Sequence, residues 1–228
     1  LSTPAKLYGE FLPILKDKDL SITNLECPLT DSLDKITKTG PNIKSSPDSI
    51  SILKDAQFDI VTLANNHILD FGEQGLFDTV NVCQKAGIKT VGVGKDKLDS
   101  QHPLIIEKKG KKIGIINVAE KEFSIATSTT GGANEFSVID VFQQIESLKE
   151  QVDIILLIIH GGLEHYALPT PSLKKHCHFF ASLGVNAIVC HHTHCVSPYE
   201  IINGVPIFYS LGNFIFDRPN CFHETWYE

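Results

Sequence analysis

The stretch that decides the fold is VDIILLIIH, residues 152–160. Its apolar part, residues 154–159, is the longest apolar run of the chain and is typical of a strand buried in a parallel sheet. The segments on either side, residues 138–149 and 171–183, carry apolar residues at helical spacing. A buried strand between two helices is the repeating unit of a layered α/β protein.

The same alternation extends outward to both ends of the chain. We expect helices over residues 7–15, 72–86 and from Pro47, strands over 20–25, 58–64, 88–93, 152–159 and 185–190, and hairpins over 104–118 and 199–209. Two polar stretches, residues 30–46 and 124–134, are predicted to be surface loops, and loops as long as the first are usually functional or mobile. Since no linker or repeat interrupts the pattern, residues 1–228 are predicted to form one domain.

Composition excludes several classes of protein. The chain has 20 basic and 27 acidic residues, and its net charge of −7 argues against a nucleic-acid binder. The six cysteines include no CxxC pair, and Cys83, Cys177 and Cys190 are expected to be buried thiols. No apolar run approaches the ~18–20 residues of a membrane-spanning helix, and no signal peptide is expected in the given sequence. Met is absent, even at position 1, which indicates that the chain begins inside a longer gene product.

Polar residues follow the predicted strands directly, at the edge where α/β sheets build their sites. They are Asn24 and Glu26 after the first strand, Asn65, Asn66 and His67 after the second, His160 after the strand quoted above, and His191, His192, Thr193 and His194 after the next.

The His192-Thr193-His194 triplet is the sharpest local signal. Alternate residues of an extended segment point to one side, so these two imidazoles could converge on one ion. The same alternation turns His191 and Cys195 to the other side and argues against a direct role for them. A His-x-His pair also arises by accident on surfaces and in cores, and that alternative stays open.

Each remaining candidate has a structural alternative. His160 could be a satisfied histidine at a strand end, Glu26 a solvated loop residue, and Asp70 the cap of a helix beginning near Gly72. His67 could simply hydrogen-bond a backbone carbonyl. Taken together, imidazole, carboxylate and amide donors without thiolate suit Mn, Fe or Zn, and His67 could then be the general acid that protonates a leaving group.

Five motifs support a family resemblance. They are NLECPLT (24–30), LANNH (63–67) with DFG (70–72), HGGLE (160–164), HTH (192–194) and YSLGNFIFD (209–217). In these motifs, which cover nearly the whole chain, the sequence resembles the CapA capsule-synthesis proteins, also called poly-γ-glutamate synthesis proteins. That family is similar to the calcineurin-like metallophosphatases.

The resemblance implies an α/β fold, a four-layer α-β-β-α sandwich of metallophosphatase type, with its site at the strand ends. It also implies two divalent ions, Mn, Fe or Zn, in the full-length protein. The implied ligands are Glu26, Asn66, His160, His192 and His194, the implied catalytic acid is His67, and the implied substrate-contacting or supporting residues are Asn24, Asn65, Asp70, Glu164 and Asn213.

Two features depart from the family pattern. Members carry an upstream Gly-Asp motif whose Asp resembles the first metal ligand, and the chain is expected to lack that N-terminal strand. Gly161 stands where the family usually has an aromatic residue, and His165 stands where Tyr is usual. His165 is therefore either an extra ligand or a rim residue.

The function implied is a metal-dependent hydrolase-like domain in the synthesis or processing of an anionic capsule polymer of poly-γ-glutamate type. Phosphoester hydrolysis and amide cleavage fit equally well. The alternatives are a non-catalytic component that binds or exports the polymer within a membrane synthase complex, and a phosphodiesterase acting on a small substrate. The family implies a cell-surface or membrane-associated location. The segment itself is expected to be soluble, without membrane insertion or a nucleic-acid partner.

Overall fold

The computed structural model describes residues 7–215, so Phe216 and Asp217 of the last motif lie outside the described residues. The chain divides into two compact units. Unit 1 comprises the residues up to His102 together with Lys121–Glu135, and unit 2 comprises Pro103–Glu120 together with the residues from Phe136 onward. That residues 1–228 act as one domain stays a prediction.

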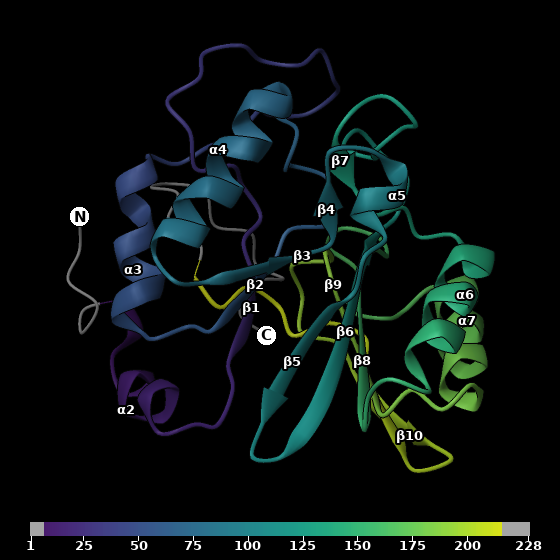
Figure 1. Cartoon of the computed structure of the whole chain (residues 1–228). Helices are drawn as coiled ribbons and strands as arrows, with labels where there is room; N and C mark the ends of the chain where they lie inside the picture. Colours follow the sequence, from purple (N-terminus) through teal and green to yellow (C-terminus); the bar gives the residue numbers. More distant parts are fainter. Residues whose placement is uncertain (1–6, 216–228) are drawn as a thin grey trace. The chain divides into compact units, whose positions relative to one another are not determined.

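Unit 1 is built on a parallel sheet of three strands in the order β1-β2-β3 (Figure 1). Asn24 pairs with Thr62, and Thr62 pairs with Val91, so the three strands end at one edge of the sheet. The elements are α2 (Phe11–Lys16), β1 (Ile22–Asn24), η1 (Pro47–Ser49), α3 (Ile50–Asp55), β2 (Ile60–Thr62), α4 (Gly72–Lys85), β3 (Lys89–Val91), β4 (Val93–Gly94), α5 (Lys97–Ser100) and β7 (Gly132–Ala133).

The prediction that residues 124–134 form a surface loop needs a correction. This stretch is not simply a surface loop, because Ser124, Ala126 and Asn134 are buried and β7 pairs with β4. Its small side chains permit close backbone packing: a Cβ on Gly132 would lie 2.6 Å from the backbone nitrogen of Ala126. Small residues therefore indicate close approach here rather than exposure.

Unit 2 is built on a mixed sheet in the order β10-β11-β9-β8-β6-β5 (Figure 1). Strands β6, β8, β9 and β11 run parallel, and a hairpin lies at each edge. The elements are β5 (Leu104–Lys108), β6 (Lys111–Ala119), α6 (Val138–Leu148), β8 (Ile154–His160), α7 (Pro171–Ser182), β9 (Ala187–His191), β10 (Tyr199–Ile202) and β11 (Val205–Phe208). Residues 154–160 of the stretch quoted first thus form an interior strand, β8.

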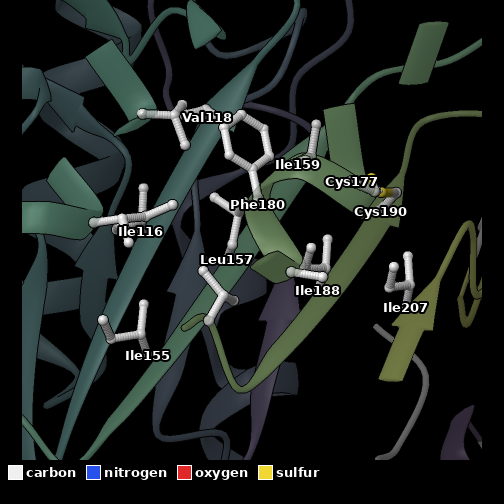
Figure 2. Packing of buried hydrophobic residues seen from close by; sticks show 14 of the residues in the cluster. Ile116, Val118, Ile155, Leu157, Ile159, Cys177, Phe180, Ile188, Cys190 and Ile207 are labelled. Atoms are coloured by element: carbon white, nitrogen blue, oxygen red, sulfur yellow. Dashed lines mark hydrogen bonds between the residues drawn. The ribbon is translucent and has the colours of Figure 1, made fainter. Parts of the chain in front are cut away.

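The main core of unit 2 lies between this sheet and helices α6 and α7. Phe180 of α7 is fully buried in it and packs among Val118, Leu157 and Ile159 (Figure 2). Both helices start at capped residues: the side chain of Ser137 accepts the N–H of Asp140 before α6, and Thr170 caps α7 in the same way. Burial of such side chains supplies most of the stability of the unit. Within residues 7–215, no helix has the length and apolar character needed to span a bilayer.

Candidate functional site

Asn24 and Asn65 tie two segments of unit 1 together at the edge where β1 and β2 end. The side-chain amide of Asn24 donates to Oε2 of Glu26 (2.8 Å), and that of Asn65 donates to the carbonyl of Leu25 (2.9 Å). Oδ1 of Asn65 accepts the backbone N–H of His67 (3.1 Å). These two asparagines therefore position Glu26 and His67. Glu26 is half-buried, so it is not a fully solvated loop residue.

Asn66 is buried, and its backbone is held by a residue far away in the sequence. The hydroxyl of Ser124 donates to the carbonyl of Asn66 (2.8 Å) across 58 residues of chain. Oγ of Ser124 also accepts the backbone N–H of Leu69 (3.3 Å). The buried part of the stretch 124–134 thus fixes the turn that carries Asn66 and His67.

His67 is paired with Asp70, and both structural alternatives for these residues are wrong. Nδ1 of His67 lies 2.7 Å from Oδ2 of Asp70, a carboxylate rather than a backbone carbonyl. Asp70 does not cap α4, because the N-cap residue is Phe71 and no side chain caps that helix. The Asp70 side chain is fully buried, whereas the His67 side chain is 12% exposed. A buried carboxylate that holds one ring nitrogen leaves Nε2 for proton transfer.

Lys38 joins this pair and was missed in the sequence. Its Nζ forms an ion pair with Oδ1 of Asp70, lies 3.1 Å from Nδ1 of His67, and stands 5.4 Å from the ring centre of Phe123. The Lys38 side chain is only 2% exposed. Nδ1 of His67 can hydrogen-bond only one of these two groups at a time. The Asp70 carboxylate requires an N–H at Nδ1, whereas the Lys38 ammonium requires a lone pair there.

The long loop 30–46 is organised around Asp70. Oδ2 of Asp70 accepts the backbone N–H of Ile43 (2.7 Å). The Asp70 carbonyl accepts the N–H of Ile36 (3.1 Å) and the side-chain amide of Asn42 (3.1 Å). One buried residue therefore orders the loop that brings Lys38 to His67.

In unit 2, His160 and His191 are the last residues of β8 and β9 and are paired in register. Their Nδ1 atoms lie 2.7 Å apart, so the prediction that His191 points away from the candidate residues is wrong. Burial, followed by the nearby charges of His192 and His194, lowers the pKa of His191 from 6.5 to about 3. His191 is therefore neutral at ordinary pH.

The strand ends at His191, and the residues after it are not extended. His192 and His194 have φ values of 114° and 61°, the left-handed region that costs a residue other than glycine ~1–3 kcal/mol. The ring of His192 lies 4.6 Å from that of His160 and 6.4 Å from that of His194, centre to centre. The three imidazoles do come together, but through a strained backbone rather than through strand alternation. Such strain is typical of functional sites.

His194 is oriented by Asn213. Oδ1 of Asn213 lies 2.8 Å from Nδ1 of His194 and accepts its proton, so the proton of the neutral ring stands on Nδ1 rather than on Nε2. The ring of His165 is 6.1 Å from that of His194, whereas the candidate Glu164 is exposed. Cys195 is buried and bonds back to Thr193.

Glu120, which follows β6, is a second residue that the sequence did not reveal. Its Oε2 accepts the backbone N–H of Gly162 (3.0 Å). A Cβ on Gly161 would lie 2.7 Å from Cγ and Cδ of Glu120. The Glu120 side chain therefore occupies the space that a side chain at position 161 would need, which accounts for the glycine there.

The donor atoms of both units suit a divalent metal ion. Unit 1 offers a carboxylate at Glu26 and an amide at Asn66, and unit 2 offers imidazoles, which ligate in their neutral form. Burial and the charges of Glu26 and Asp70 raise the pKa of the Cys27 thiol to about 12, so it is no thiolate ligand at ordinary pH. Nitrogen and oxygen donors without thiolate fit Mn, Fe or Zn.

Comparison with known proteins gives matches over almost the whole chain. The family described as "Bacterial capsule synthesis protein PGA_cap" matches residues 2–218. The chain is 30% identical over 211 residues to the PGA biosynthesis protein CapA of Bacillus subtilis, covering 90% of this chain and 55% of that protein. It is 28% identical over 221 residues to the capsule biosynthesis protein CapA of Bacillus anthracis, covering 93% and 54%. The chain thus spans about half the length of these relatives.

Solved structures agree on the fold. A phosphatase from Mycoplasma pneumoniae superimposes with a TM-score of 0.59 at 20% identity, covering 92% of this chain and 66% of that one. The predicted metallophosphatase-like α/β fold class is confirmed.

Proposed function

The chain belongs to the bacterial capsule synthesis family PGA_cap, and on that premise we propose that it is a metal-dependent hydrolase domain. It acts in the synthesis or processing of an anionic capsule polymer of the poly-γ-glutamate type. The observation that carries this proposal is the buried carboxylate of Asp70, 2.7 Å from Nδ1 of His67. A protein that only binds or exports the polymer needs no histidine held for proton transfer.

Two groups of residues would hold the metal. They are Glu26 and Asn66 of unit 1, and His160, His192 and His194 of unit 2. Divalent ions bound there supply Lewis-acid polarisation of a phosphoryl or carbonyl oxygen and activate water. They also supply the positive field that a chain of net charge −7 needs beside a polyanion.

The chain's own residues orient the ligands and transfer the proton. Asn213 sets the tautomer of His194, and Asn24 and Asn65 hold the segments that carry Glu26 and His67. His67 acts as the general acid: Asp70 holds its Nδ1, and its Nε2 gives a proton to the leaving group.

Steady-state kinetics with added Mn²⁺, Fe²⁺ or Zn²⁺ test the proposal. The substrates are an aryl phosphate, a phosphodiester with a poor leaving group, and γ-glutamyl amides. We expect His67→Ala to lower turnover of the substrate with the poor leaving group by roughly 10²–10⁴-fold, and turnover of the activated ester less. The matched control is His102→Ala, which removes a histidine whose side chain is 77% exposed.

Three outcomes decide between the functions. Equal losses on good and poor leaving groups would contradict the acid role of His67. Turnover confined to small phosphodiesters favours the small-substrate phosphodiesterase. No turnover by the wild type, together with retention of poly-γ-glutamate, favours the non-catalytic component of a synthase complex.

A further inference from the structure

Lys38 carries a charge in a part of unit 1 that is closed to water. Its side chain is only 2% exposed, and its Nζ stands 5.4 Å from the ring centre of Phe123. Lysine is almost never buried in this way unless it is paired, because burial removes both the hydration of the ammonium and the freedom of a long side chain. A cation buried at such a cost is expected to act on the group with which it is paired.

The partner of Lys38 is the carboxylate of Asp70, and both oxygens of this carboxylate are held. Oδ1 forms the ion pair with Lys38. Oδ2 accepts the backbone N–H of Ile43 and lies 2.7 Å from Nδ1 of His67. Because each oxygen has its own partners, the carboxylate cannot turn about its Cβ–Cγ bond without breaking one set of contacts. Lys38 thus fixes which oxygen faces His67.

Anchoring of the loop that carries Lys38 does not need this ion pair. The backbone carbonyl of Asp70 accepts the N–H of Ile36 and the side-chain amide of Asn42, both at 3.1 Å. Oδ2 of Asp70 accepts the N–H of Ile43 at 2.7 Å. These hydrogen bonds join the loop to Asp70 whatever side chain stands at position 38. An anchoring role alone therefore leaves the buried ammonium unexplained.

The ammonium of Lys38 also approaches the histidine, but it acts on the ring through the carboxylate. Nζ of Lys38 lies 3.1 Å from Nδ1 of His67, whereas Oδ2 of Asp70 lies 2.7 Å from the same atom. If Nδ1 accepted a proton from Lys38, its lone pair would face the lone pairs of Oδ2 across that shorter distance. With its proton on Nδ1, His67 instead donates to Oδ2, and Lys38 keeps Oδ1 as its own acceptor.

We propose that Lys38 is a positioning residue for His67: it holds Oδ1 of Asp70, so that Oδ2 stays against Nδ1 and the ring presents Nε2 to the leaving group. This inference rests on the proposed function, since it concerns the acid of the same site. The His67 side chain is 12% exposed, so a ring without the carboxylate at Nδ1 can turn to another rotamer. Loss of Lys38 then misorients the acid without removing it.

Kinetics with two leaving groups test this role. Lys38→Met removes the charge but keeps the length of the side chain, and Lys35→Met is the matched control at an exposed position of the same loop. Turnover of the aryl phosphate and of the phosphodiester with the poor leaving group is measured with added Mn²⁺, at a temperature where circular dichroism shows each variant folded. We expect Lys38→Met to lower the ratio of kcat for the poor leaving group to kcat for the aryl phosphate by about 10- to 100-fold. The KM values should change little, and Lys35→Met should leave the ratio unchanged.

A double-mutant cycle with Asp70→Asn shows whether Lys38 acts through Asp70. In the Asp70→Asn background, Lys38→Met should change the ratio by no more than about 2-fold, because the carboxylate that Lys38 holds is already gone. An unchanged ratio in folded Lys38→Met would overturn the inference, and so would equal losses on the two substrates. The same fall in both backgrounds would also overturn it, since Lys38 would then act without Asp70.

A second readout depends neither on turnover nor on the folding of a variant. Long-range ¹H–¹⁵N spectra of the wild-type chain, recorded at a pH where the ring of His67 is neutral, report its tautomer, and we expect the proton on Nδ1. A proton on Nε2 would mean that Nδ1 accepts from Lys38, and it would overturn the inference even if Lys38→Met did not fold. If the wild type turned over none of the substrates, the proposed function would fail, while this tautomer would still decide whether Asp70 holds His67.

Discussion

Lys38 and Asp70 form an ion pair inside unit 1, with side chains that are 2% and 0% exposed. Lys38 lies on the loop 30–46, and Asp70 precedes α4, so the pair joins the loop to the turn that carries His67. Attraction between buried charges offsets the cost of taking both from water only while both are present. Lys38 therefore stabilises the group of residues around His67, in addition to placing an ammonium group beside that histidine.

We expect Lys38→Met to lower the free energy of unfolding by about 3–5 kcal/mol, because it leaves the carboxylate of Asp70 buried without its cation. Urea denaturation measures the change. The control is Lys35→Met on the same loop, an exposed residue whose loss should change stability by no more than about 0.5 kcal/mol. Similar values for the two variants would show that the buried pair contributes nothing.

Divalent metal should raise the melting temperature of the wild-type chain. An ion that binds only the folded state stabilises it by about 2.7 kcal/mol when its concentration is 100 times its dissociation constant. The double variant His192→Ala, His194→Ala should lose this rise, whereas His102→Ala should keep it. A metal-induced shift that survives in the double variant would place the ions elsewhere.

Gly161→Ala should destabilise unit 2 through Glu120. The new Cβ would lie 2.7 Å from Cγ and Cδ of Glu120, so that side chain must move and lose its hydrogen bond to the N–H of Gly162. A hydrogen bond to a charged group contributes about 1.5–3 kcal/mol. In the Glu120→Ala background Gly161→Ala should cost much less, and a double-mutant cycle by urea denaturation measures the difference. Additive costs would mean that position 161 is restricted by something other than Glu120.

The sequence predicted the elements well because their signals are local. The apolar run before His160 is a buried strand. The hairpin predicted over residues 199–209 is present, and it turns at Asn203 and Gly204, whose φ values are 52° and 84°. The polar residues after β1 and β2, and after β8 and β9, likewise fall at strand ends as predicted. Hydrophobic periodicity and turn residues are therefore sufficient to predict the strands, the turns and the polar residues at the strand ends.

The missed contacts depend on long-range packing or on an unusual backbone. Lys38 lies 29 residues before His67, and Ser124 reaches Asn66 across 58 residues, so no local pattern connects them. The prediction that His191 lies on the other side from His192 and His194 relies on strand alternation, which does not continue beyond the end of β9. The left-handed conformation of His192 breaks that alternation, and propensity gives no warning of it in a residue other than glycine.

Protonation of Glu200 should lower the stability of unit 2 in acid. The hydroxyl of Tyr209, followed by the imidazole of His178, lowers the pKa of Glu200 from 4.5 to about 2. Between these values the unfolded chain binds more protons than the folded one. The contribution of Glu200 is therefore fully present above pH 4.5 and is lost as the pH falls to about 2.

Glu200→Gln should flatten the decline of unfolding free energy across that range, and Tyr209→Phe, which removes the first cause of the shift, should flatten it in part. Urea denaturation at several pH values between 5 and ~2 measures the slopes. The control is Glu107→Gln on β5, which removes the same charge from an exposed position. If the wild type, Glu200→Gln and Glu107→Gln declined in parallel, the hydrogen bonds of Glu200 would have no part in acid stability, and other carboxylates would have to account for it.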